Sequence, residues 1–109
     1  MEYSQYINRV ELQGSVGTSK VISIGDKKVV RFSLATNYAY KDKEGYPVIE
    51  TTWHACSVWA EREADLTMYR KGTPLHIEGR IRNIRYTDAS GCERTTLEVA
   101  ATKVERVEL

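Results

Sequence analysis

The segment Thr51-Thr52-Trp53-His54-Ala55-Cys56-Ser57-Val58-Trp59 holds both tryptophans of the 109-residue chain and one of its two histidines. Because side chains alternate along a strand, one face carries Trp53 and Trp59 with small residues between them, and the other face carries His54. At ~3.3 Å per residue, the two indoles lie roughly 20 Å apart, too far to touch. We interpret them either as core residues, the commoner role of a tryptophan, or as two binding surfaces.

The composition and length favour one soluble globular domain. Hydrophobic residues make up 41% of the chain and charged residues 28%, which is enough apolar surface for one core. We therefore expect a single domain over residues 1–109. No apolar run reaches the length of a membrane span, and Met1 to Tyr6 lack the pattern of a secretory signal. This predicts a cytoplasmic location without a membrane partner, while the net charge of +1 indicates no particular partner.

Two cysteines, Cys56 and Cys92, and two histidines, His54 and His76, are the residues considered for metal binding. Their spacing contains neither Cys-x-x-Cys nor His-x-x-x-His, so we expect two free thiols, no metal site and no cofactor. The chain also lacks a glycine-rich phosphate loop and a Gly-x-Ser-x-Gly turn. An enzyme is therefore the interpretation that the sequence supports least.

Alternating apolar residues predict four further long strands around the tryptophan segment. They cover residues 8–17, with a bend or bulge at Gly14 and an end at Gly17, and residues 29–40, 74–86 and 94–107. A short apolar piece at 21–24 leads into a turn at 25–28. The residues expected to face inward are Val10, Leu12, Val16, Val30, Phe32, Leu34, Leu75, Ile77, Gly79, Ile81, Leu97, Val99 and Ala101.

One helix is predicted between the third and fourth strands, over Glu61–Lys71. Acidic residues in its first turn, basic residues in its last turn and Gly72 directly after it match the charge and capping preferences of helices. Five strands, this helix, and long hairpin loops over 41–47 and 87–93 indicate an all-β OB-fold, a five-stranded Greek-key barrel.

Aromatic and basic residues occupy the positions that a binding face of this barrel would use. Tyr40 precedes the first long loop, and Tyr86 precedes the second, with Arg80 and Arg82 on the same outer face of the fourth strand. An aromatic ring stacks on any nucleobase, basic side chains neutralise phosphates, and duplex DNA hides the base faces. The pattern favours binding of single-stranded DNA; tyrosines that cover apolar surface and arginines on a solvated face are the alternative interpretation.

Several motifs follow one another along the chain. They are Asn8-Arg9-Val10, Gly14-x-Val16-Gly17, Leu34-Ala35-Thr36, Thr51-x-Trp53-His54, Tyr69-Arg70-Lys71-Gly72, Ile77-Glu78-Gly79 and Tyr86-Thr87-Asp88-x-Ser90-Gly91. In this order they resemble the DNA-binding domain of the bacterial single-stranded DNA-binding proteins, across nearly the whole chain. The resemblance implies an OB-fold that assembles as a homotetramer and wraps and protects single-stranded DNA in replication, recombination and repair.

The resemblance also implies roles for single residues. Base stacking falls to Trp53, to Trp59 in place of a common phenylalanine, and to Tyr40 and Tyr86 in place of common tryptophans. The candidates for phosphate contacts are Arg9, Lys43, Lys71, Arg80 and Arg82, of which Lys43, Lys71 and Arg82 match basic positions of the family.

Three further positions bear on the strength and assembly of such a site. Glu61 and Ala55 each replace a basic residue of the family, which weakens the local positive field. His54 matches a histidine associated with the subunit interface; a neutral histidine satisfied within its own subunit is the equal alternative.

The end of the sequence departs from the family pattern. The family continues into a flexible linker and a short acidic tip that recruits replication and repair proteins, whereas this sequence stops at 104–109. The sequence is therefore either a trimmed binding domain or a short natural form, and replication and repair proteins stay open as partners, without an acidic tail in this sequence to recruit them. A second interpretation is an interaction module that resembles primosomal replication protein N, a dimer that bridges replication proteins. The Trp53-His54 pair and the Ile77-Glu78-Gly79 motif fit the tetrameric family better.

Overall fold

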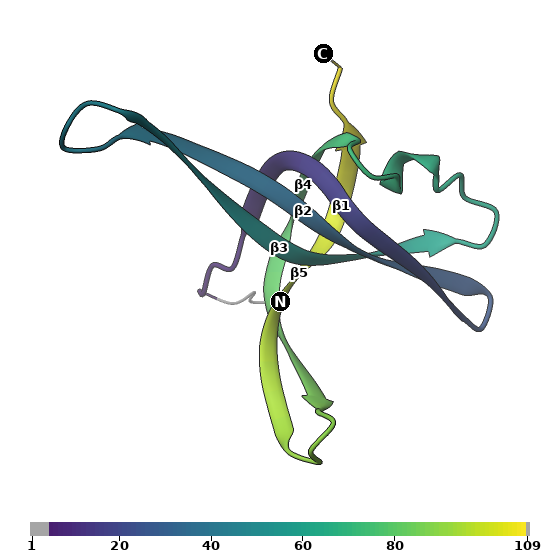
Figure 1. Cartoon of the computed structure of the whole chain (residues 1–109). Helices are drawn as coiled ribbons and strands as arrows, with labels where there is room; N and C mark the ends of the chain where they lie inside the picture. Colours follow the sequence, from purple (N-terminus) through teal and green to yellow (C-terminus); the bar gives the residue numbers. More distant parts are fainter. Residues whose placement is uncertain (1–4, 109) are drawn as a thin grey trace.

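The computed structural model of the chain describes residues 5–108, so Leu109 and residues 1–4 of the N-terminal segment considered above lie outside it. Five long strands close into a barrel in the order β1-β2-β3-β5-β4 (Figure 1). This confirms the predicted all-β, five-stranded barrel. The strands are β1 (Val10–Ile24), β2 (Lys27–Lys41), β3 (Pro47–Glu61), β4 (Pro74–Thr87) and β5 (Glu93–Arg106).

Strand β1 bends so that it pairs with two neighbours. Ser15 is the switch, because it lies opposite Ala35 of β2 and Pro74 of β4. Gly14 permits this bend, since a Cβ at residue 14 would lie 2.9 Å from the Ala35 carbonyl carbon. The expected end at Gly17 is wrong: the register shifts between Val16 and Ser19, and β1 then continues to Ile24.

The core lies inside the barrel and is formed mainly by residues that alternation predicted to face inward. Its buried members are Val16, Val30, Phe32, Leu34, Cys56, Tyr69, Leu75, Ile77, Val99 and Ala101. Two expected core residues are instead exposed, Ile81 at 41% and Leu97 at 60%. They lie where β4 and β5 leave the barrel as a two-stranded ribbon, because β3 pairs with β5 only over Cys56–Val58.

The predicted helix over Glu61–Lys71 is wrong. Strand β3 runs on to Glu61, and the connection to β4 contains only the 3-10 turn η1 (Thr67–Tyr69). The charge pattern resembled that of a helix, but the segment is held by the barrel. The Tyr69 ring is buried and lies 5.2 Å from the Phe32 ring, and the N–H of Gly72 donates to the Val16 carbonyl. The segment therefore covers one end of the core.

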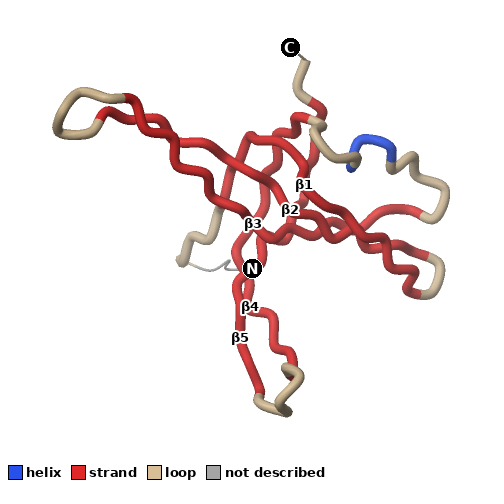
Figure 2. The backbone as a smooth tube through the Cα atoms, viewed as in Figure 1, coloured by secondary structure: helices blue, strands red, loops and turns tan. Residues whose placement is uncertain are grey.

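Three hairpins project from the barrel in different directions (Figure 2). They join β1 to β2, β2 to β3, and β4 to β5, through turns at 25–26, 42–46 and 88–92. Within residues 5–108, no helix has the length and apolar character that a membrane crossing needs.

Candidate nucleic-acid interface

The two tryptophans lie on the outer face of β3. The β2–β3 register places Ala35 opposite Trp53 and Val29 opposite Trp59, while the alternate pair of Leu34 and His54 lies on the barrel side. The tryptophan side of β3 therefore faces outward over its whole length. Trp53 is 60% exposed and Trp59 is 59% exposed, so neither belongs to the core. The alternation read from the sequence separates these two faces correctly.

Trp53 lines an open pocket of about 430 Å³ together with Lys71. The remaining lining comes from Gly17, Thr18 and Ser33, whose small side chains leave the indole accessible. Lys71 reaches this position because the connection after η1 folds back against β1. The pocket therefore combines an aromatic surface with one cation, and both members were predicted site residues.

Trp59 lines a second pocket, of about 210 Å³, together with Arg82. Arg82 lies on β4 opposite Glu98 of β5 in the antiparallel ladder. Arg31 of β2 lines the same pocket, and in its own ladder it lies opposite Ser57. Two strands far apart in sequence thus bring arginines to the same indole.

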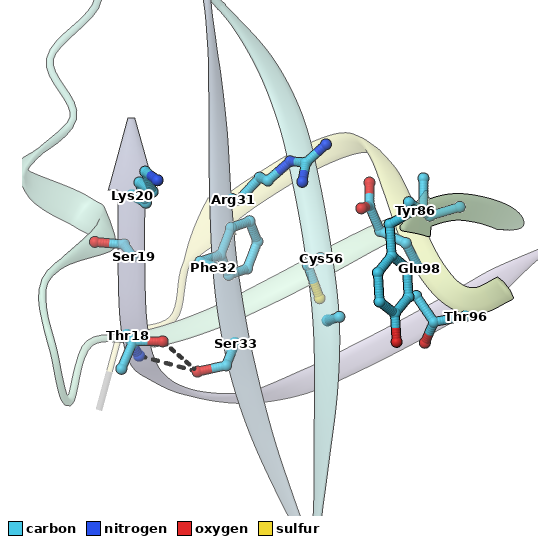
Figure 3. Close-up of a pocket in the computed structure, with 12 residues that line it drawn as sticks. Thr18, Ser19, Lys20, Arg31, Phe32, Ser33, Cys56, Tyr86, Thr96 and Glu98 are labelled. Carbon is cyan, nitrogen blue, oxygen red and sulfur yellow. Dashed lines mark hydrogen bonds between the residues drawn. The ribbon is translucent and has the colours of Figure 1, made fainter. Parts of the chain in front are cut away.

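Tyr86 lines a pocket of about 500 Å³ with Lys20 and Arg31 (Figure 3). Figure 3 shows Tyr86 beside Thr96 and Glu98 at one end of this pocket. Lys20 and Arg31 were not among the predicted site residues. Their signal lies in the alternation of β2: Arg31 stands between the inward Val30 and Phe32, and so faces the side of the tryptophans.

The structure does not bring the other predicted residues to these pockets. Tyr40 lies opposite Val48, two residues from Tyr38 and four from Thr36, on the side of the hairpin that carries His54. Its ring centroid is 6.0 Å from that of Tyr38. Lys43 is exposed in the 42–46 loop.

Arg9 and Arg80 are exposed basic residues near the β1–β4 ladder. A guanidinium nitrogen of Arg9 lies 3.7 Å from a carboxylate oxygen of Glu78, so its charge is partly balanced. Arg80 lies opposite Ala100 of β5, two residues from Arg82 and on the same face of β4. Neither residue lines the pockets that hold Trp53, Trp59 and Tyr86.

Glu98 is the polar residue that sequence reasoning missed. It is only 8% exposed, and the Ser57 hydroxyl donates a hydrogen bond to its Oε1. Burial, with a smaller contribution from the Glu98 charge, raises the pKa of the Cys56 thiol to about 12. The apolar pattern drew attention to the neighbouring Leu97, and no local signal marks Glu98 as buried.

His54 is half-buried and hydrogen-bonded within its own chain. Its Nε2 lies 2.9 Å from the hydroxyl oxygen of Thr36 on the neighbouring strand. Its expected place at a subunit interface therefore stays a prediction. Both cysteines are free thiols, with Cys56 buried and Cys92 exposed in the 88–92 turn.

A closed five-stranded barrel with aromatic and basic side chains on its outer face defines an OB-fold with a candidate nucleic-acid interface. The model of the single-strand binding protein family matches residues 7–107. The chain belongs to this family.

Three similar proteins are named single-stranded DNA-binding proteins. The chain is 33% identical over 102 residues to the single-stranded DNA-binding protein of Xylella fastidiosa, with 91% of this chain and 62% of that protein covered. It is 28% identical to that of Neisseria meningitidis, over 91% of this chain and 59% of that protein. The mitochondrial single-stranded DNA-binding protein of Danio rerio is 31% identical, with 90% of this chain and 74% of that protein covered. The chain thus spans about three fifths of the length of the two bacterial relatives.

Two solved structures share the fold. One, described as a Plasmodium falciparum SSB complex with ssDNA, superimposes with a TM-score of 0.74 at 24% identity, over 98% of this chain and 100% of that chain. The other is a deletion mutant of the single-stranded DNA binding protein from Thermus aquaticus, with a TM-score of 0.73 at 19% identity, over 94% and 51%. At these identities the likeness establishes the fold.

Proposed function

We propose that this chain binds single-stranded DNA with little sequence preference and protects it during replication, recombination and repair. The observation that carries the proposal is that three exposed aromatic rings each share a pocket with a basic side chain. Trp53 shares one with Lys71, Trp59 with Arg82, and Tyr86 with Lys20 and Arg31. The names of the relatives support the same function.

The chemistry of these pairs suits an unpaired strand. Every nucleobase has a π-face, and stacking on an aromatic side chain is worth ~1–3 kcal/mol per base in single-strand binders of this class generally. Lysine and arginine neutralise phosphates and release counterions. In duplex DNA the base faces are stacked on one another, so this arrangement selects single strands without reading base edges.

The remaining predicted residues extend the proposed path beyond the pockets. Arg80 continues the row of Arg82 on β4, and Lys43 offers a cation on the 42–46 loop. Arg9 supplies a phosphate contact in competition with Glu78. Tyr40 joins the path where a longer strand passes round the β2–β3 hairpin.

The proposal has an assembly and a cellular side. We propose one domain over residues 1–109 that forms a homotetramer, with His54 near the subunit interface, and that acts in the cytoplasm at the nucleoid. The chain binds DNA without catalysing a reaction. Relatives named as single-stranded DNA-binding proteins support this assignment over the primosome-type interaction module.

The central experiment is a fluorescence titration with poly-dT, because both tryptophans lie on the proposed path. We expect quenching of tryptophan emission, an affinity that falls as salt rises, and weak binding of a duplex of the same length. The absence of both quenching and salt-dependent binding would overturn the proposal. Light scattering with and without a long poly-dT strand separately measures the assembly.

A further inference from the structure

Glu98 lies where three pockets of the candidate interface meet. It lines the pocket of Tyr86, the pocket of Trp59, and a third pocket of about 220 Å³ that Trp53 also lines. Figure 3 shows the Glu98 side chain beside Tyr86 at one end of the pocket of about 500 Å³. Glu98 thus shares a pocket with each of the three aromatic residues that we propose to stack on bases.

The bonding of this carboxylate is incomplete. The Ser57 hydroxyl donates to Oε1, and within residues 5–108 no other hydrogen bond and no ion pair engages the Glu98 side chain. Arg82 and Arg31 line the same pocket as Glu98 but do not form a salt bridge with it. No buried side-chain oxygen of the described residues lacks a partner, so Oε2 lies open at the pocket surface, where it can accept a hydrogen bond from a bound group.

A purely structural role accounts for only half of this arrangement. The bond from Ser57 joins β3 to β5 beside their short parallel ladder, and it uses Oε1. It leaves Oε2 available on a face that also carries the basic residues Lys20, Arg31 and Arg82. A phosphate would be repelled from this point, whereas the edge of a base would not.

We propose that Glu98 accepts a hydrogen bond from the exocyclic amino group of a base bound beside Tyr86, and so favours cytosine, adenine and guanine over thymine at that one position. This inference rests on the proposed function. An ionised carboxylate only accepts hydrogen bonds. Cytosine and adenine present an amino group where thymine presents a carbonyl oxygen, and a carboxylate is a recognised acceptor for the cytosine amino group.

The preference is compatible with binding that tolerates most sequences. Stacking on Trp53, Trp59 and Tyr86 does not depend on the base edge. The identity of the base therefore affects affinity only at the position beside Glu98. Its effect is therefore greatest on short strands, in which one position is a large share of the contacts.

The test compares oligo-dC with oligo-dT of about 12 nucleotides, a length in the range of one OB-fold. The measured quantity is the ratio of the two dissociation constants, obtained for the wild-type chain, Glu98→Gln and Glu105→Gln. Glutamine keeps an acceptor for Ser57 and adds a donor that tolerates the thymine carbonyl. Glu105 is an exposed acid on the same strand, in the ladder with His76, so its variant removes the same charge elsewhere.

We expect Glu98→Gln to shift the ratio toward oligo-dT by roughly ten- to a hundredfold, the range of one hydrogen bond to a charged group. Glu105→Gln should leave the ratio at its wild-type value. Equal ratios in all three proteins would overturn the inference while leaving the proposed function intact. If the wild-type chain bound neither oligomer, the proposed function itself would fail.

A second measurement needs no variant and holds even where Glu98→Gln fails to fold. Oligo-dC can be made with 2-pyrimidinone, which is cytosine without its amino group. The wild-type chain should bind this strand with the affinity it has for oligo-dT or weaker. Undiminished, cytosine-like affinity would contradict the role of Glu98.

Discussion

The indole of Trp53 packs against Gly17. A Cβ built on Gly17 would lie 2.9 Å from Cη2 of that indole and closer still to Cζ3, so any side chain at residue 17 displaces the ring. Gly17 lies in the irregular stretch of β1 between Val16 and Ser19, where the register with β2 shifts. The bulge and the missing side chain together set the position of the first stacking surface.

The substitution Gly17→Ala should therefore tilt the Trp53 indole and weaken binding of single-stranded DNA by roughly five- to tenfold, since about 1 kcal/mol of stacking is lost. In a Trp59→Phe background Trp53 is the only tryptophan, so its emission maximum and its quenching by poly-dT report the change directly. Ser23→Ala, on the same strand near the 25–26 turn, is the control and should alter neither. An unchanged emission spectrum in Gly17→Ala would show that the indole has not moved.

Alternation along the sequence predicts which face of a strand each side chain occupies, but it does not predict where a strand leaves the barrel. The separation of Trp53 from His54 follows from alternation alone. Leu97 is in phase with Val99, yet it is 60% exposed, because where β5 leaves the barrel depends on its pairing with β3. Such pairing joins residues far apart in sequence, and no local pattern records it.

The same limit explains the missed members of the candidate site. Lys20 and Arg31 reach the pocket of Tyr86 through the β1–β2 ladder and the barrel closure, and Glu98 is buried by its neighbours across strands. The helix prediction failed for a related reason. Its charge pattern was correct for a helix, but packing of Tyr69 on Phe32 decided the conformation.

Basic residues on the interface should differ in their contribution to the salt dependence of binding. Arg82→Ala removes a cation that lines the Trp59 pocket, and should lower the slope of log K against log salt by about one. Arg9→Ala removes a guanidinium whose charge is already partly balanced by Glu78, 3.7 Å away. The slope of log K against log salt should therefore change less in Arg9→Ala than in Arg82→Ala. Titrations at several salt concentrations measure both. Equal losses for the two variants would contradict the ranking drawn from their surroundings.

Tyr40 should matter only for long strands. Tyr40 and Trp53 lie on different faces of the β2–β3 hairpin. A short oligomer bound on the tryptophan face therefore does not reach Tyr40. We expect Tyr40→Ala to leave the affinity for an oligomer of about 8 nucleotides unchanged and to weaken binding of long poly-dT. Tyr38→Ala removes the neighbouring ring, 6.0 Å from that of Tyr40, and should likewise leave binding of the short oligomer unchanged. A loss of affinity for the short oligomer would place Tyr40 on the main path.

Asn8 should stabilise the barrel although its side chain is exposed. Its Nδ2 donates to the Ile81 carbonyl at 2.7 Å, and its Oδ1 accepts from the Ile81 N–H at 2.9 Å. These bonds extend the β1–β4 ladder past Val10. Asn8→Ala should lower the free energy of unfolding by about 1–2 kcal/mol, measured by urea denaturation. Asn8→Asp keeps only the acceptor for the Ile81 N–H, so its free energy of unfolding should lie between those of the wild-type chain and Asn8→Ala. An unshifted urea midpoint in Asn8→Ala would show that Asn8 does not stabilise the barrel.

Asp88 should hold the 88–92 turn, and with it the end of β4 that carries Tyr86, down to strongly acidic pH. The Arg94 side chain, followed by hydrogen bonds from Ser90 and the Cys92 N–H, lowers the pKa of the Asp88 carboxyl from 3.8 to about 2. Because the folded-state pKa is depressed, this stabilisation is complete above pH 3.8 and is lost as the pH falls through about 2.

The amide resonances of Ser90 and Cys92, followed by NMR from pH 5 downward, measure this transition. We expect both to stay constant to about pH 3 and to move together near pH 2, as their shared acceptor is protonated. In Asp88→Asn the residue no longer titrates, so the concerted shift should vanish. A midpoint near pH 4 in the wild-type chain would mean that Arg94 does not hold the carboxylate in solution, and that the turn is not fixed by Asp88.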